Sequence, residues 1–141
     1  MINVFVTAYD DFNDFPLLEK IYDKLFSKTN KNELFFYCTV GSPGDNTCMR
    51  YILKNKLKYN DWLSPRKGKI IKIEREKILV ECDYAIIFID GYHKGMFTAM
   101  KQSIRYVKKL VVVNISKKEI IKFDSETETE KKYSYCDETL Q

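Results

Sequence analysis

Two glycine-containing stretches carry the residue types best suited to binding a small ligand. The first, 41–46, has the sequence Gly-Ser-Pro-Gly-Asp-Asn and lies between an apolar and an amphipathic run, which is the order strand, loop, helix. The first N–H groups of a helix suit an anion, and Gly41 and Gly44 permit the close backbone approach that a phosphate needs. The stretch is neither a Walker A sequence nor a complete G-x-G-x-x-G, so taken alone an ordinary strand-to-helix turn explains it better.

The second stretch, 90–95, has the sequence Asp-Gly-Tyr-His-Lys-Gly and follows the apolar run 84–89. Asp90 ends that run, where a carboxylate could accept a hydrogen bond from a sugar hydroxyl or cap a turn, and the two interpretations are equally favoured. His93 is the only histidine, so a Ser–His–Asp or Cys–His arrangement would have to include it. A surface histidine is the favoured interpretation, and a hydrogen bond to a ligand comes second.

Charged residues and cysteines elsewhere offer weaker candidates. Asp10 and Asp11 could act as a carboxylate pair in acid–base chemistry or bind Mg²⁺, although a solvated turn is favoured. Arg75 is a candidate for a phosphate contact, with an ion pair to a neighbouring glutamate as the alternative. The four cysteines form no C-x-x-C pair, so we expect free thiols, mostly buried, in a reducing cytoplasm, and no metal site.

Length and composition indicate a globular protein of one domain. The chain has 141 residues, of which 45% are hydrophobic and 31% charged, and no apolar run of about 18 residues that would cross a membrane. The first residues lack the basic region that opens a signal peptide, so we expect a cytoplasmic protein. The net charge of +4 could favour a phosphorylated partner, although a solvated lysine-rich surface is the commoner explanation. Nucleic acid is a less favoured partner, because the basic residues follow no known nucleic-acid-binding pattern.

Apolar runs of strand length alternate with stretches of helical periodicity along residues 1–114. This alternation predicts an α/β fold of three layers, in which helices flank a five-stranded parallel sheet of order 3-2-1-4-5. The expected strands are 2–8, 34–40, 59–63, 84–89 and 110–114, and the expected helices are 15–27, 48–57, 73–82 and about 97–107, with a basic loop at 64–72. Such sheets bind ligands outside the carboxyl ends of their strands, where the loops 9–13, 41–46 and 90–97 should converge.

The C-terminal segment, 116–141, differs in composition from the domain expected at 1–115. Ser116-x-x-Glu119 matches a capping box and predicts a short helix over 117–123. Residues 124–141 are polar and lack apolar periodicity, so composition predicts disorder. Tyr133, Tyr135 and Leu140 are the large apolar groups in this part, and they could dock on the domain itself or on a second copy.

Short motifs follow a recognisable order along residues 1–114. Thr7–Phe12 corresponds to a strand followed by Gly-Ser-Arg-Asp-Phe, and Val40–Asn46 corresponds to Gly-Gly-Ala-Arg-Gly-Ala-Asp. Further along, Asn60–Trp62 corresponds to Ala-Asp-Trp, 74–78 to Arg-Asn-Arg-Glu-Met, and Asp90–Gly91 with Gly95–Met96 to Asp-Gly and Gly-Thr. In this order the chain resembles the SLOG superfamily of Rossmann-like nucleotide-binding proteins, in particular its small YspA-like branch.

The resemblance implies a Rossmann-like fold, a small nucleotide or nucleotide-derived ligand, and pairing into a homo-oligomer. The ligand-binding residues that it and the converging loops imply are Ala8, Tyr9, Asp10, Gly41, Ser42, Gly44, Asp45, Asn46, Arg75, Asp90, Gly91, Gly95 and Thr98. A bulky residue in place of Gly44 should then abolish ligand binding and leave the protein folded.

Three functional hypotheses follow. The first is a nucleotide sensor or sequestering protein, the second a nucleotide hydrolase such as an N-glycosidase, and the third a protein-interaction module built on a former nucleotide pocket. The first and third are favoured over the second, because the sequence holds no complete catalytic constellation and no motif that identifies a catalytic residue.

Overall fold

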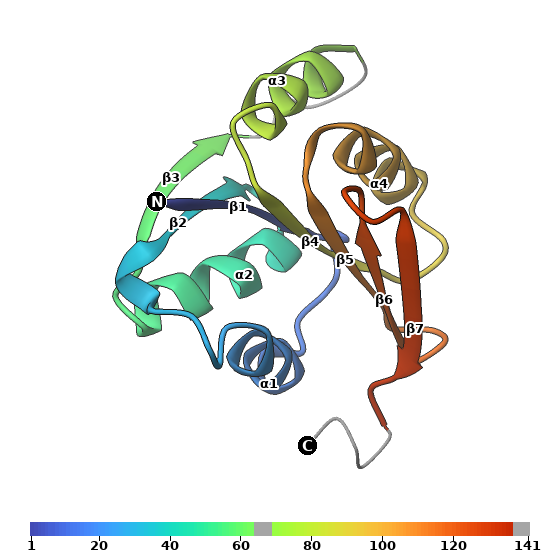
Figure 1. Ribbon diagram of the computed structural model, residues 1–141. Coiled ribbons are helices and arrows are strands. Elements are labelled where there is room, and N and C mark those ends of the chain that lie inside the picture. Colours follow the sequence, from blue (N-terminus) through green and yellow to red (C-terminus); the bar gives the residue numbers. More distant parts are fainter. Residues whose placement is uncertain (64–68, 137–141) are drawn as a thin grey trace.

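The computed structural model describes residues 1–63 and 69–136, which form a mixed seven-stranded sheet with helices on both faces (Figure 1). The strands are β1 (Ile2–Ala8), β2 (Leu34–Val40), β3 (Lys58–Leu63), β4 (Tyr84–Ile89), β5 (Lys109–Asn114), β6 (Glu119–Asp124) and β7 (Thr129–Ser134). The helices are α1 (Phe15–Leu25), the 3₁₀ turn η1 (Lys31–Glu33), α2 (Pro43–Lys54), α3 (Lys69–Leu79) and α4 (Lys94–Tyr106). Within the described residues, no helix is both long and apolar enough to cross a bilayer.

The strands from β1 to β5 are parallel and lie in the order β3-β2-β1-β4-β5, which confirms the predicted α/β class and the predicted order of these five strands. β1 and β4 are central, and their apolar sequences are buried on both faces, as in other doubly covered parallel sheets. Val4 and Phe88 belong to the cluster under α1 and α2, whereas Phe5 and Ile87 belong to the cluster under α3 and α4.

The predicted extent of the sheet is wrong, because two antiparallel strands, β6 and β7, continue it beyond β5. The helix predicted over 117–123 does not form. The Ser116 hydroxyl donates to the carbonyl of Asp90 instead of capping a helix. A strand also lets both neighbouring isoleucines pack: Ile120 is buried in the cluster under α1 and α2, and Ile121 is half-buried against the cluster under α3 and α4.

The predicted disorder of 124–141 is wrong for β7 and the residues just after it. Tyr133 and Tyr135 pack against the cluster under α1, so these two aromatic residues dock on their own domain. Residues 137–141, which include Leu140, lie outside the described part of the chain, as do residues 64–68 of the expected basic loop. The third helix, Lys69–Leu79, begins and ends earlier than the predicted 73–82. It ends earlier because Cys82 lies in a turn, in which its N–H donates to the carbonyl of Leu79.

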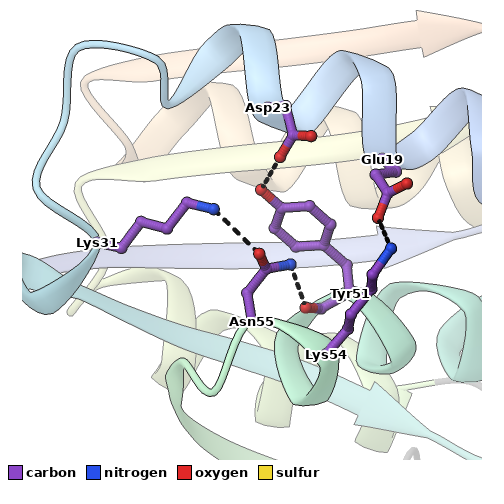
Figure 2. Close-up of polar contacts among 6 residues, drawn as sticks. All are labelled: Glu19, Asp23, Lys31, Tyr51, Lys54 and Asn55. Atoms are coloured by element: carbon purple, nitrogen blue, oxygen red, sulfur yellow. Dashed lines mark hydrogen bonds and ion pairs between the residues drawn. The ribbon is translucent and has the colours of Figure 1, made fainter.

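Polar contacts join α1 to α2, the two helices that cover one face of the sheet (Figure 2). The Tyr51 hydroxyl donates to Asp23 Oδ1 at 2.7 Å, and Lys54 Nζ lies 2.6 Å from Glu19 Oε2. Asn55, which follows α2, donates through Nδ2 to the Tyr51 carbonyl at 2.9 Å. The first two contacts hold α1 against α2 near the carboxyl end of α2, and the third closes that end of the helix.

Candidate functional site

The carboxyl edge of the parallel strands brings together loops that are far apart in the sequence. The connection that leaves β1 passes through α1 to β2 on one side, and the connection through α3 enters β4 on the other side, so strand order reverses between β1 and β4. Ligands of open α/β sheets bind at such a reversal. The Tyr9 N–H donates to the Phe88 carbonyl at 3.1 Å, which holds the loop after β1 against the end of β4.

Tyr9, Asp90 and His93 form a compact group at this reversal. The rings of Tyr9 and His93 are stacked, with centroids 5.6 Å apart and an angle of 29° between their planes. Asp90 Oδ1 accepts the N–H groups of Tyr92 at 2.9 Å and His93 at 3.1 Å, and Asp90 Oδ2 lies 2.7 Å from His93 Nδ1. Since Nδ1 is occupied by Asp90, Nε2 is the ring nitrogen left for a ligand.

Electrostatics keep Asp90 ionised and Tyr9 protonated. Burial by itself would raise the pKa of Asp90, but the two backbone N–H groups and the His93 ring outweigh it, so the pKa of Asp90 is lowered. Burial and then the charges of Asp90, Asp14 and Asp11 raise the pKa of Tyr9. The group therefore offers an ionised carboxylate, an imidazole oriented by that carboxylate, and a phenol that can donate.

The glycine loop before α2 uses its backbone N–H groups internally. Ser42 caps α2, Pro43 has no N–H, and the Gly44 N–H donates to the Asp10 carbonyl at 2.9 Å. The N–H of Asp45 donates to Ser42 Oγ at 3.1 Å, and the N–H of Asn46 donates to the Ser42 carbonyl at 2.9 Å. These donors are no longer available to a phosphate, so the loop does not have the open anion site that the sequence predicted.

Close packing explains why position 44 is glycine. A Cβ atom at Gly44 would lie 2.1 Å from the carbonyl oxygen of Tyr9, so only glycine lets the start of α2 reach the loop after β1. A bulky residue here would displace backbone. We therefore expect such a variant to lose stability as well as any ligand binding. Gly41 differs, since its φ of +125° favours glycine while the space around it is open.

Asp45 is a buried carboxyl that joins the ends of β1 and β2 to α2. The Thr7 hydroxyl donates to Asp45 Oδ1 at 3.2 Å. Burial raises the pKa of Asp45 to about 6, although hydrogen bonds from Thr39, Thr7 and Ser42 oppose that rise. With 6% of its surface exposed, Asp45 is a structural residue beneath the edge and is not positioned to touch a ligand.

Arg75 is buried between α3 and α4. Its Nη1 donates to Gln102 Oε1 at 3.0 Å, and Gln102 in turn donates to the Lys72 carbonyl at 2.9 Å. Burial lowers the pKa of the Arg75 guanidinium, and the charge of Asp45 opposes that change. No ion pair joins Arg75 to a carboxylate of the described residues, so the predicted pair with a neighbouring glutamate does not form there.

The glycine loop before α4 is open. His93 occupies the N-cap position of α4 and makes no side-chain capping bond. Within 1–63 and 69–136, no acceptor is found for the N–H groups of Lys94 and Gly95. Added Cβ atoms at Gly91 and Gly95 would meet nothing within 4 Å. The donors that suit an anion are thus available at α4, whereas those at α2 are taken.

The predicted site residues divide accordingly. Tyr9, Asp90, Gly91 and Gly95 meet at the open part of the edge. Ala8 is not part of it, because its side chain is buried in the cluster under α1 and α2. Of the remaining predicted residues, Gly44 and Asp45 are buried, whereas Gly41, Asp10 and Asn46 are exposed. Ser42 caps α2, and Arg75 contacts Gln102. Thr98 is half-buried on α4.

His93 is the residue that the predicted ligand set omitted. The sequence signal for His93 was its position three residues after Asp90, at the start of a helix. An aspartate at that spacing can cap the turn and also orient the histidine ring. The four cysteines are free; three are buried and Cys136 is exposed. Burial raises the pKa of Cys82 to about 12, so its thiol stays protonated near neutral pH.

Other features of the described residues do not add chemistry to this edge. No group of three or more His, Cys, Asp or Glu side chains that could hold a metal ion occurs among them. Two concavities lie elsewhere, between α1 and the strands β5 to β7. The sequence matches no family model, and neither a curated protein nor a solved structure matches it significantly.

Proposed function

We propose that the carboxyl edge binds a small nucleotide or a nucleotide-derived ligand, and that the protein acts as a sensor or sequestering protein for it. The observation that carries the proposal is the stacked pair of Tyr9 and His93 at the strand reversal, with His93 oriented by Asp90. The resemblance of residues 1–114 to the SLOG superfamily supports the same ligand class, and membership of that superfamily is part of this proposal.

Each part of a nucleotide has a matching group at this edge. A base can stack on an exposed aromatic face, and His93 Nε2 and the Tyr9 hydroxyl supply hydrogen bonds to its polar rim. A phosphate can accept from the N–H groups of Lys94 and Gly95, where the positive end of the α4 dipole also favours an anion. The ligand therefore lies over β4 and α4 in this proposal, and not in the loop before α2.

A nucleotide hydrolase is the second candidate, and the Asp90–His93 pair is the observation that favours it. A carboxylate on Nδ1 orients the ring, so Nε2 is the nitrogen that could take a proton from a water molecule as a general base. Apart from the Tyr9 phenol, no nucleophile or second acid is placed beside His93 by a contact among the described residues, which is why binding without turnover ranks first.

A thermal-shift screen against mononucleotides, dinucleotides and cyclic nucleotides tests the proposal. A ligand at 100 times its dissociation constant should stabilise the fold by about 2.7 kcal/mol. The variants Tyr9→Leu and His93→Ala should lose most of that stabilisation. The matched control is Tyr92→Ala, because Tyr92 lies in the same loop, is 80% exposed, and makes no ring contact within the described part.

Two outcomes would contradict the proposal. One is that no nucleotide shifts the melting temperature, which would favour the protein-interaction hypothesis. The other is that a hit is retained by the Tyr9 and His93 variants. Mass spectrometry of any hit after incubation with the protein then separates a binder from a hydrolase.

A further inference from the structure

A groove runs between α1 and the strands that extend the sheet beyond β5. It consists of a concavity of about 400 Å³ near the amino edge and a smaller one of about 50 Å³ midway along α1. The two are adjacent, since Leu25 of α1 and Lys122 of β6 line both. We call this feature the α1 groove. Its larger part falls within the usual size of small-ligand pockets, about 300–1,000 Å³.

The floor of the α1 groove is apolar and incompletely covered. On this face α1 and α2 cover the sheet at β1, β2 and β4, while β6 and β7 reach beyond them (Figure 1). Ile2, Leu25 and Val111 line the groove and are only half-buried, although each packs against the cluster under α1 and α2. We call these three side chains the apolar strip, and partly exposed apolar side chains in a concave setting are typical of binding sites.

The walls of the α1 groove are basic. The lysines that line its two parts are Lys20, Lys24, Lys109, Lys122 and Lys131, and the acid is Asp124. Asp124 Oδ1 is engaged in the turn between β6 and β7, where it accepts the N–H of Glu126 at 3.0 Å. Among the described carboxylates, none forms an ion pair with Lys109, Lys122 or Lys131.

Two of these lysines lie directly opposite each other. The register of β6 and β7 pairs Lys122 with Lys131 on the face that bears the groove, and Lys122 is half-buried with its ammonium 5.3 Å from the centre of the Tyr133 ring. Like charges at directly opposed positions of an antiparallel pair destabilise a sheet. The chain therefore carries two unfavourable features side by side: half-buried apolar surface and a pair of opposed lysines for which no ion pair is found among the described carboxylates.

We propose that the α1 groove binds an organic anion with a linear apolar body, of the alkyl carboxylate or alkyl phosphate class. The alkyl chain covers the strip at Ile2, Leu25 and Val111, and the anionic head lies between Lys122 and Lys131. One occupant of this kind relieves both unfavourable features. Inorganic phosphate relieves only the charge, and a neutral alcohol relieves only the apolar strip.

A chain-length series measured by calorimetry tests the proposal on the full chain. Alkyl carboxylates and alkyl phosphates of increasing length, kept below their critical micelle concentrations, should bind about fourfold more tightly per added methylene until the groove is filled. The alcohol of matched length and inorganic phosphate alone should each bind far more weakly than either anion. The carboxylate and phosphate arms distinguish the two sources of the anionic head.

Variants locate the site. The double variant Lys122→Gln/Lys131→Gln should weaken binding about tenfold. The matched control is Lys132→Gln, because Lys132 is the next residue of β7, points to the other face, and pairs with Glu119 at 3.7 Å. His93→Ala should leave binding of the alkyl anion unchanged, because His93 lies at the carboxyl edge and outside the α1 groove. A negative result for the alkyl anion therefore says nothing about nucleotide binding, and the reverse also holds.

Three results would overturn the proposal. The first is an affinity that does not change with chain length, which would indicate a surface anion contact. The second is an equal loss of affinity in the Lys132 control. The third is binding of an acidic amphipathic peptide in the groove while no alkyl anion binds, which would make the groove a protein-docking surface.

Discussion

The two glycine loops at the carboxyl edge look alike in sequence and differ in what their backbone does. Before α2, the N–H groups of Gly44, Asp45 and Asn46 all donate to oxygens of the chain itself. Before α4, the N–H groups of Lys94 and Gly95 have no acceptor within the described residues. A glycine-rich strand-to-helix loop therefore does not identify an anion site, and what identifies one is whether the first donors of the helix are already taken.

The comparison extends to the acids of the two loops. Asp45 is buried under α2 with hydroxyl donors, and burial dominates, so its pKa rises to about 6. Asp90 receives two backbone N–H groups and the His93 ring, and these outweigh burial, so its pKa falls. The closed loop holds a carboxyl whose ionisation the fold disfavours, and the open loop holds one whose ionisation the fold favours.

The largest expected effect comes from filling the space at position 44. Gly44→Ala should destabilise the protein by about 3 kcal/mol, because the new methyl group would lie 2.1 Å from the Tyr9 carbonyl oxygen and backbone must move. Chemical denaturation measures the change. A loss below about 1 kcal/mol would mean that the start of α2 does not pack on the loop after β1 as described.

Asp45→Asn should raise stability at alkaline pH. A pKa of about 6 in place of 3.8 makes ionisation in the folded state cost about 3 kcal/mol above pH 6. Loss of the favourable charge near the helix N-terminus offsets up to about 1 kcal/mol, so a gain of about 2 kcal/mol is expected at pH 8.

The sign of the pH dependence is the sharper test of Asp45. Between pH 4 and 6 the folded state holds a proton that the unfolded state releases, so wild-type stability falls as pH rises through this window. The difference between the variant and the wild type should be near zero or negative at pH 4 and reach its full value above pH 6. A variant that is less stable at every pH would show that Asp45 is ionised without cost.

The sequence predicted the central sheet well because β1 and β4 are covered on both faces. Their apolar runs are continuous, and a run of that length is typical of a parallel strand buried on both faces. β6 and β7 escaped prediction because the strand character of β6 depends on pairing with β5, and that of β7 on pairing with β6. Ile120 and Ile121 are adjacent, so neither a helical nor an alternating period stands out, and Ser116 satisfied a local helix pattern that tertiary contacts override.

The sequence could predict the edge of the sheet at which the candidate site lies, but not which backbone N–H groups there are free to donate. Parallel strands with crossover helices place the three loops on one edge by topology alone. Whether the N–H of Gly44 meets the Asp10 carbonyl or a phosphate depends on backbone positions to within an ångström. Sequence reasoning therefore favoured an anion site at the first loop, whereas the N–H groups without an acceptor among the described residues lie at the second.

Asp90→Asn should cost about 1 kcal/mol at pH 7, since the charged acceptor of two N–H groups and of His93 Nδ1 is lost. Because the pKa of Asp90 is lowered by folding, its contribution is present above the unfolded value and is lost as pH falls through the folded value. The gap between variant and wild type should close in acid. The control Asp11→Asn removes an exposed acid of the neighbouring loop and should change stability little.

The smallest expected effect has the opposite sign and completes the comparison. Gly95→Ala should stabilise the protein by about 0.5 kcal/mol, because Gly95 lies in the first turn of α4, an added Cβ meets nothing within 4 Å, and alanine restricts the unfolded chain. The same methyl group enters the space over the free N–H groups, so any nucleotide that binds there should bind more weakly to this variant. Calorimetric unfolding with and without a nucleotide hit separates the two effects. Destabilisation comparable to that of Gly44→Ala would mean that the loop before α4 is closed as well, and the distinction between the two loops would be lost.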